Sequence, residues 1–467
     1  MHSFRIAAML AGIATGSVWP TAALAHASSQ SFVALLPTGP YRLVGVVIVG
    51  VSIALLALLP PSAASRPDGP RPGWPGAPPG VRMVVSLLSA LLLVWLISAG
   101  FLGSRDPLEN GLVLAFWVVF WMALVIGQGL FGNLWGWLSP FNGIGRLFER
   151  GFGWRGFLRL PGWLGAWPAV FLLLGFSGFT LADPAPDDPA RLAGLLICYG
   201  IFTLAGMGLF GARSWLARVE FFTVLMRQFV RLAPLVGQGR FWRLDWPAAA
   251  LCRPRKLLPG LSVFCVVLLG TGSFDGFNET FFWLDLIGVN PLAFPGRSAV
   301  IVPVLAGLVG ANILLLVLFT CLLLLGDRLA GARRSGAELL MVFAPTLLPI
   351  ALGYHIAHYL PSLLVDGQYA LLALNDPLSL GQDWLGLAGY HVTTGFFNNR
   401  DTMNFIWLAQ AAGIVFGHVL AVIVADRRAV RLYQGRRAVW LAQAPLALFM
   451  IGYTWLGLWL LAAPKGG

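Results

Sequence analysis

The stretch AVIVPVLAGLVGANILLLVLFTCLLLLG (residues 299–326) contains no charged side chain and decides the class of fold. It is longer than the ~20 apolar residues that an α-helix needs to cross the hydrocarbon core of a bilayer. The whole chain has a similar character, because 58% of its 467 residues are hydrophobic and only 11% are charged. A soluble domain carries about 25% charged residues, so this composition excludes an ordinary soluble protein.

Nine further segments resemble this one in length and apolar content. The chain is therefore predicted to be an all-α, polytopic integral membrane helix bundle, with about ten transmembrane helices after a signal peptide. Residues 26–467 are predicted to form a single transmembrane helical domain. The spans are expected at residues 41–60, 83–103, 111–131, 161–181, 192–212, 257–274, 299–326, 338–362, 404–425 and 439–462.

The first 25 residues have the pattern of a signal peptide. A short basic start, MHSFR, precedes the apolar stretch IAAMLAGIATGSVW, which is too short to span a bilayer. Ala23, Leu24 and Ala25 then fit a cleavage site of the small-x-small type. Cleavage would leave His26 as the first residue of the mature protein, outside the cytoplasm. The alternative is an uncleaved anchor helix.

Basic residues gather in alternate connectors between the spans. The connectors 61–82, 132–160, 213–256, 327–337 and 426–438 contain 24 Lys and Arg residues, whereas the connectors of the opposite side contain six. The positive-inside rule then predicts a multi-pass protein of the bacterial inner membrane with both mature termini in the periplasm. The net charge of +12 follows from this topology and does not indicate a nucleic-acid partner.

Two of the cytoplasmic connectors are long enough to have a structure of their own. The segment 60–82 is rich in Pro and Gly, which predicts an extended linker without a packed core. The basic connector 213–256 has arginines interleaved with aromatic and aliphatic residues, and an amphipathic helix on the inner leaflet is expected there. A solvated basic loop is the alternative.

His355 and His358 lie one helical turn apart in the predicted span 338–362. Imidazoles at this spacing share a helix face and can bind one metal ion, for which zinc, copper or a similar divalent metal is suitable. His26 belongs to a predicted periplasmic segment, and its amino group and ring would chelate the same ion. We therefore expect these three histidines to share a divalent metal near the periplasmic surface. The alternative is that each forms a hydrogen bond across the bundle.

His418 is the fourth candidate metal ligand. It lies about 20 Å along the predicted span 404–425, at 1.5 Å per residue, and could meet the other histidines only at the floor of a water-filled funnel. Gly417 beside it predicts a close approach of a neighbouring helix, because small residues let helix backbones come together in membranes.

Two carboxylates follow the sixth predicted span on the same side. Asp275 and Glu279 could act as a general base on water or complete a metal shell, and the alternative is a capped helix end in a solvated loop. The segment 363–403 is too apolar for a free loop. It is expected to fold over the site as a periplasmic lid, with His391 and Asp376 as lid or substrate contacts.

The order of these features resembles a family of bacterial polytopic membrane proteins known as fenitrothion hydrolases. The resemblance covers mainly residues 260–430, and it implies hydrolysis of an organophosphorus triester with release of a nitrophenol. No ligand set is carried over from the family. The matching pieces are ALAHASS (23–29), FDGFNETFFW (274–283), APTLLPIALGYHIAHYLPSLLVDGQ (344–368), NDPLSLGQDW (375–384) and FGHVLAVIVADRRAV (416–430).

These observations together predict a membrane-bound hydrolase of organophosphorus triesters such as fenitrothion, acting through metal-activated water. The expected partners are the lipid bilayer and an apolar small-molecule substrate, while a membrane-protein partner subunit is not specified by the sequence. The alternative function is a transporter or metal-handling permease with a histidine-lined cavity near mid-membrane.

Overall fold

The computed structural model describes residues 38–58, 74–75, 79–238, 241–253 and 257–465. The predicted signal peptide, His26 and most of the Pro-rich linker lie outside these ranges. Within them, nine helices are long and apolar enough to cross a membrane, and Trp167–Ala182 forms a shorter apolar helix. The prediction of an all-α, polytopic helix bundle is therefore confirmed.

Each of the ten predicted spans corresponds to a helical segment, although several helices are longer than predicted. The segments are α3 (Thr38–Leu58), α4 (Pro79–Leu102), α5, η3 and α6 (Gly111–Leu114, Ala115–Leu124 and Val125–Phe131), α9 (Trp167–Ala182), α10 (Pro189–Phe210), α13 (Leu261–Asn278), α15 (Ile301–Leu329), α16, η8 and α17 (Gly336–Phe343, Ala344–Leu347 and Leu348–Asn375), α18 (Arg400–Leu432) and α19 (Arg436–Ala462).

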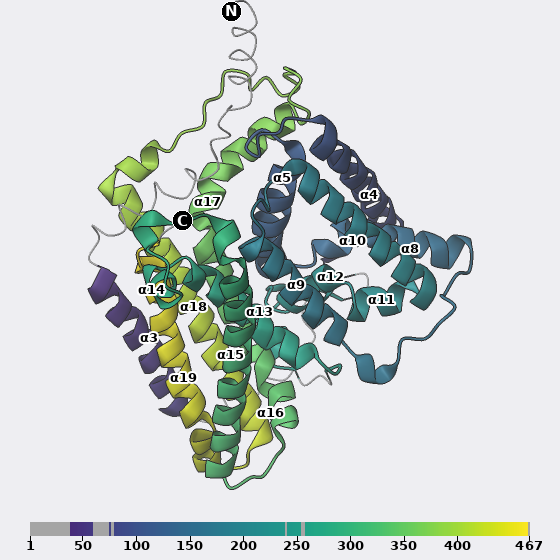
Figure 1. Ribbon diagram of the computed structural model, residues 1–467. Helices are drawn as coiled ribbons and strands as arrows, with labels where there is room; N and C mark the ends of the chain where they lie inside the picture. The colour runs from purple at the N-terminus through teal and green to yellow at the C-terminus, as the bar shows by residue number, and fades with distance from the viewer. Residues whose placement is uncertain (1–37, 59–73, 76–78, 239–240, 254–256, 466–467) are drawn as a thin grey trace, which may run out of the picture.

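The connectors gather at two opposite ends of the long helices (Figure 1). At one end, the Lys465 ammonium lies 3.1 Å from the Glu279 carboxylate, and the Ser379 hydroxyl donates to the Glu109 carbonyl at 3.1 Å. At the other end, Arg334 pairs with Asp327 at 2.8 Å. These contacts join connectors that are distant in the sequence. Which end faces the cytoplasm stays a prediction.

Glycine lets α17 and α18 cross at very short range. A Cβ atom on Gly417 would lie 2.6 Å from the Pro349 carbonyl oxygen, and one on Gly353 would lie 2.5 Å from the Gly413 carbonyl oxygen. Real side chains essentially never show such contacts. The close helix approach predicted at Gly417 is confirmed, and it places the histidines of α17 beside α18.

The basic connector 213–256 is folded into the bundle. It forms α11 (Ala212–Arg218) and α12 (Phe221–Phe229), and nearly every residue of α12 is buried. The prediction of a surface helix or a solvated loop is wrong for α12, because most of its side chains are apolar and they are buried against neighbouring helices. Its cap, Glu220, is 0% exposed, and burial raises the pKa of this carboxyl.

A small antiparallel sheet follows α12, with the strand order β1-β3-β2. Strand β1 (Trp74–Pro75) comes from the Pro-rich linker and pairs with β3 (Phe241–Leu244), which in turn pairs with β2 (Leu235–Gln238). The remaining short helices are α7 (Trp135–Leu138), α8 (Pro140–Gly151) and α14 (Phe281–Leu286), together with 3-10 turns at Gly162–Leu164, Ala249–Leu251, Pro291–Ala293, Arg297–Val300 and Gly395–Asn398.

Two of the spanning segments have irregular helical geometry. The segment η3 is a π-helix, and η8 is a 3-10 turn that interrupts the helix between α16 and α17. Such interruptions are frequent at functional sites. The segment η3 borders the cavity described next through Trp121, whereas η8 does not line it and only precedes α17, which borders the cavity through His355.

Candidate functional site

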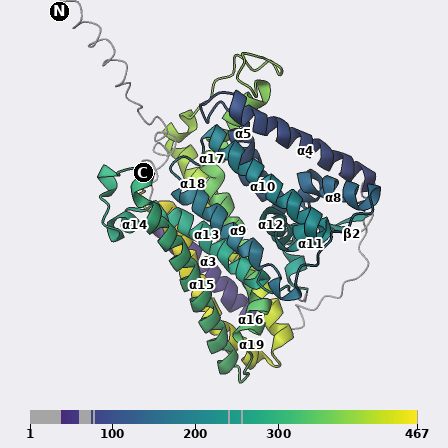
Figure 2. The same cartoon turned by 45° about the vertical axis from the view of Figure 1, so that its right-hand side comes forward.

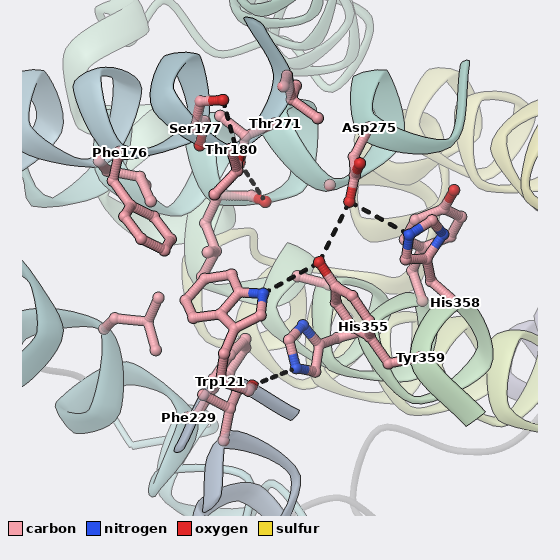
Figure 3. A pocket seen from close by; sticks show the side chains of 18 residues that line it. Trp121, Phe176, Ser177, Thr180, Phe229, Thr271, Asp275, His355, His358 and Tyr359 are labelled. Atoms are coloured by element: carbon pink, nitrogen blue, oxygen red, sulfur yellow. Dashed lines mark hydrogen bonds and ion pairs between the residues drawn. The ribbon is translucent and has the colours of Figure 1, made fainter. Parts of the chain in front are cut away.

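A cavity of about 60 Å³ lies where α9, η3, α12, α13 and α17 meet (Figure 3). Most of the side chains that line it are apolar, among them Leu173, Phe176, Leu225, Phe229 and Leu268. Its volume is about that of two water molecules at ~30 Å³ each. The cavity is therefore a small, mostly apolar pocket with a few polar groups, and a larger guest requires movement of a lining side chain.

Asp275 is the centre of the polar part of this cavity. Its Oδ2 atom accepts a hydrogen bond from the Tyr359 hydroxyl at 3.3 Å and lies 3.3 Å from Nε2 of His358. The indole Nε1 of Trp121 donates to the Tyr359 hydroxyl oxygen at 3.0 Å. Figure 3 shows the carboxylate between the imidazole and the phenol. We call Asp275, His358, Tyr359 and Trp121 the Asp275 network.

The network is assembled from elements that are distant in the sequence. Asp275 belongs to the last turn of α13, while His358 and Tyr359 are neighbours in α17. Neighbouring residues on a helix project about 100° apart, so a carboxylate that lies between their two directions can contact both. The His358 ring also stacks on the ring of Tyr354, with centroids 5.8 Å apart, which limits its rotation.

His355 contacts a different partner from His358. Its Nε2 atom lies 3.0 Å from the Trp121 carbonyl oxygen, and its ring meets the indole of Trp121 edge-on at 5.5 Å. A carbonyl only accepts hydrogen bonds, so this nitrogen carries a proton and does not coordinate a metal in this arrangement. The structure brings His355 and His358 into one cavity and directs their Nε2 atoms to separate groups.

The donor set for a metal is incomplete among the described residues. No group of three or more His, Cys, Asp or Glu side chains there is arranged to hold an ion. Asp275 and His358 supply two donors, whereas a catalytic zinc usually has three protein ligands. The third ligand expected from the sequence, His26, lies outside the described residues. The shared metal site therefore stays a prediction, with Asp275 and His358 as the described residues that could hold it.

His418 lies apart from the cavity. Its side chain is buried, with the residue 1% exposed, and its Nδ1 atom lies 2.9 Å from the Ile414 carbonyl oxygen of the preceding helical turn. The nearest aromatic ring is Tyr453, at 6.4 Å between centroids, and the Tyr453 hydroxyl in turn contacts Ser273 at 2.6 Å. This hydrogen bond lies within α18, and the Nε2 atom of His418 is buried without a hydrogen-bond partner among the described residues, so both the metal role and a hydrogen bond across the bundle stay predictions.

The other candidate residues do not line the cavity. Glu279 follows α13 and contacts Lys465 near the C-terminus. Asp376 accepts hydrogen bonds from three backbone N–H groups of its own loop, and His391 is exposed. The first part of the predicted lid, residues 363–375, instead continues α17, so only the part after it forms an irregular segment.

Tyr359 and Trp121 were missed by sequence reasoning, because the residues predicted for the site were only histidines and carboxylates. Tyr359 could have been found, since its hydroxyl is a polar group adjacent to His358 within an apolar span. Trp121 had no such signal, because it is one of nineteen tryptophans and reaches Tyr359 across 238 positions of sequence.

Comparisons of the chain with protein-family models, curated proteins and solved structures found no match.

Proposed function

We propose that this chain is a membrane-embedded hydrolase in which Asp275 and His358 activate a water molecule against an apolar phosphotriester. The observation that carries the proposal is the Asp275 carboxylate, held between an imidazole and a phenol in an apolar cavity. Ionisable residues inside a membrane are costly and commonly mark a functional site. The substrate class comes from the resemblance to fenitrothion hydrolases.

The proposed reaction begins with proton transfer from water to His358. With its Nε2–H directed to Asp275, the imidazole offers Nδ1 as the base, and the carboxylate stabilises the imidazolium that forms. The resulting hydroxide attacks phosphorus, the phosphorus–aryloxide bond breaks, and the aryloxide takes the proton back from His358. The products are a dialkyl phosphate or thiophosphate and a nitrophenol. Tyr359 holds the carboxylate in place through its hydroxyl.

The apolar surroundings suit a neutral substrate. A triester such as fenitrothion has no charge and partitions into a bilayer, from which it can approach a cavity enclosed by spanning helices. The cavity holds water-sized guests, so we expect a side-chain rearrangement to admit the phosphorus centre. In an alternative arrangement, Asp275, His358 and His26 would hold a divalent metal in place of this base pair, and the metal would supply a Lewis acid for the phosphoryl oxygen.

A permease is a second candidate, favoured by the interrupted helix at Ala344–Leu347. Discontinuous spanning helices often form the substrate sites of secondary transporters. This candidate predicts ion or solute uptake into proteoliposomes and no release of nitrophenol by the purified protein, and the hydrolase predicts the reverse.

Replacement of Asp275 by Asn tests the hydrolase. The change removes the negative charge that stabilises the imidazolium, so the turnover of fenitrothion by purified protein should fall by ~10²–10⁴-fold. Glu279→Gln is the matched control, because this carboxylate lies one helical turn away, contacts Lys465 and does not line the cavity. Equal turnover in Asp275→Asn and wild-type protein would refute the proposed role.

A further inference from the structure

A second cavity, of about 170 Å³, lies beside the α6–α7 connection. Its lining includes Arg82 of α4, Arg146 of α8 and Arg227 of α12, together with the polar side chains of Gln128 and Asn142. Figures 1 and 2 show α4, α8 and α12 on the same side of the molecule. Three arginines from three different helices thus line one partly open cavity, which we call the basic cavity.

The described lining of the basic cavity is positively charged. None of the described residues that line it is acidic. The Nε atom of Arg82 is buried without a hydrogen-bond partner among the described residues, while its guanidinium lies over the Trp137 ring at 5.0 Å. Burial, followed by the charges of Arg150 and Arg82, lowers the pKa of Arg146. Clustered and partly dehydrated cations favour an anion between them.

The wall of the basic cavity is held by buried hydrogen bonds. The Gln128 amide donates to the Met226 carbonyl at 2.9 Å and accepts from the Trp135 backbone N–H at 2.9 Å. The Trp135 indole donates to the Thr223 hydroxyl at 2.9 Å. These bonds fasten α6, α7 and α12 together. A wall that is already ordered reduces the entropy lost when a ligand binds.

Close packing of α8 on α4 brings two of the arginines together. The Gly143 backbone N–H donates to the Ser86 hydroxyl at 2.6 Å, and a Cβ atom on Gly143 would lie 3.0 Å from the Met83 carbonyl oxygen. Arg82 and Arg146 lie next to these contact points, on either side of the helix interface. Their side chains therefore reach the same cavity from two directions.

We propose that the basic cavity binds a phosphate-bearing anion. The guanidinium of arginine presents a planar set of donors that matches phosphate oxygens in pairs, and arginines on separate helices can surround one phosphate group. The volume corresponds to about six water molecules at ~30 Å³ each, which accommodates a phosphate with a small substituent. The phosphate belongs either to a lipid headgroup or to a soluble compound. This inference does not depend on the proposed hydrolase.

The test uses full-length protein in detergent and follows tryptophan fluorescence, since Trp135 lines the cavity. One arm titrates inorganic phosphate against sodium chloride of equal ionic strength. The other arm reconstitutes the protein in nanodiscs with or without phosphatidylglycerol. We expect saturable binding in at least one arm. A response to phosphate identifies a soluble ligand, and a response to phosphatidylglycerol alone identifies a headgroup.

Variants of the lining arginines test whether the change in fluorescence comes from binding in the basic cavity. Arg82→Gln with Arg146→Gln should raise the half-saturating concentration at least about tenfold, as expected from lost charge-assisted hydrogen bonds. Arg146→Lys keeps the positive charge and should weaken binding less than the double variant does. It therefore distinguishes the loss of charge from a folding defect. Arg213→Gln is the control, because its side chain is 90% exposed and lies outside the cavity. Absence of binding in both arms, or equal binding by the double variant, overturns the proposal.

Discussion

His355 and His358 differ in what their rings contact, and this difference separates two mechanisms. His358 faces Asp275, whereas His355 faces the Trp121 carbonyl. If Asp275 and His358 form the base, His358→Phe should lower turnover by ~10²–10⁴-fold. His355→Phe should retain most activity and lose about 1 kcal/mol of stability with its hydrogen bond. A shared metal predicts instead that both variants lose metal and activity together. Turnover, metal content and melting temperature of each purified variant distinguish the two.

The candidate site could be predicted in part from single residues. A histidine or carboxylate inside an apolar span is visible in the sequence, and Asp275, His355 and His358 were selected for this reason. Their partners were not visible, because Asp275 and Tyr359 are separated by 84 positions and meet only through helix packing. Glu279 is equally visible in the sequence, whereas its contact with Lys465 depends on where the C-terminus folds.

At the scale of elements, the crossing of α17 and α18 depends on the absence of side chains at its glycines. Gly417→Ala should force these helices apart, since a Cβ atom there would lie 2.6 Å from the Pro349 carbonyl oxygen. Overpacking of this kind typically costs 1–3 kcal/mol. The expected result is a lower melting temperature of the purified protein.

Gly367→Ala is the matched control for this crossing. Gly367 also lies in α17, but a Cβ atom there would meet nothing within 4 Å among the described residues. Alanine favours a helix over glycine by about 1 kcal/mol, so this variant should melt at or above the wild-type temperature. Equal losses in both variants would contradict the packing argument.

A helix could be predicted where its own run of residues specifies it. It could not be placed where its surroundings depend on elements that are distant in the sequence. A long apolar run specifies a spanning helix by itself, and each predicted span corresponds to an observed helical segment. The burial of α12 could not be foreseen, because its nine residues are too few to span a membrane and the arginines around it indicate a surface. Its environment is supplied by α6, α9 and α17, which lie far away in the sequence.

At the scale of the whole molecule, the distribution of basic residues predicts the orientation in the membrane. Reporter fusions after residues 145, 240 and 332 should show cytoplasmic activity, and fusions after 186 and 385 should show periplasmic activity. The reason is the preference of Lys and Arg for cytoplasmic connectors, which hold 24 of them against six on the other side. Any two fusions with reversed activity would overturn this orientation.

The enclosed position of α12 also constrains how the protein is made. Spanning helices can leave the translocation machinery one after another as they are synthesised, because each can face lipid. Helix α12 is surrounded by protein instead, and part of that protein is α17, which begins at Leu348, more than a hundred residues later in the chain. The nascent chain must therefore hold Phe221–Phe229 in an unfinished arrangement until α17 is inserted. During that interval the segment lacks the contacts that α17 supplies, and its burial is complete only after α17 has been inserted.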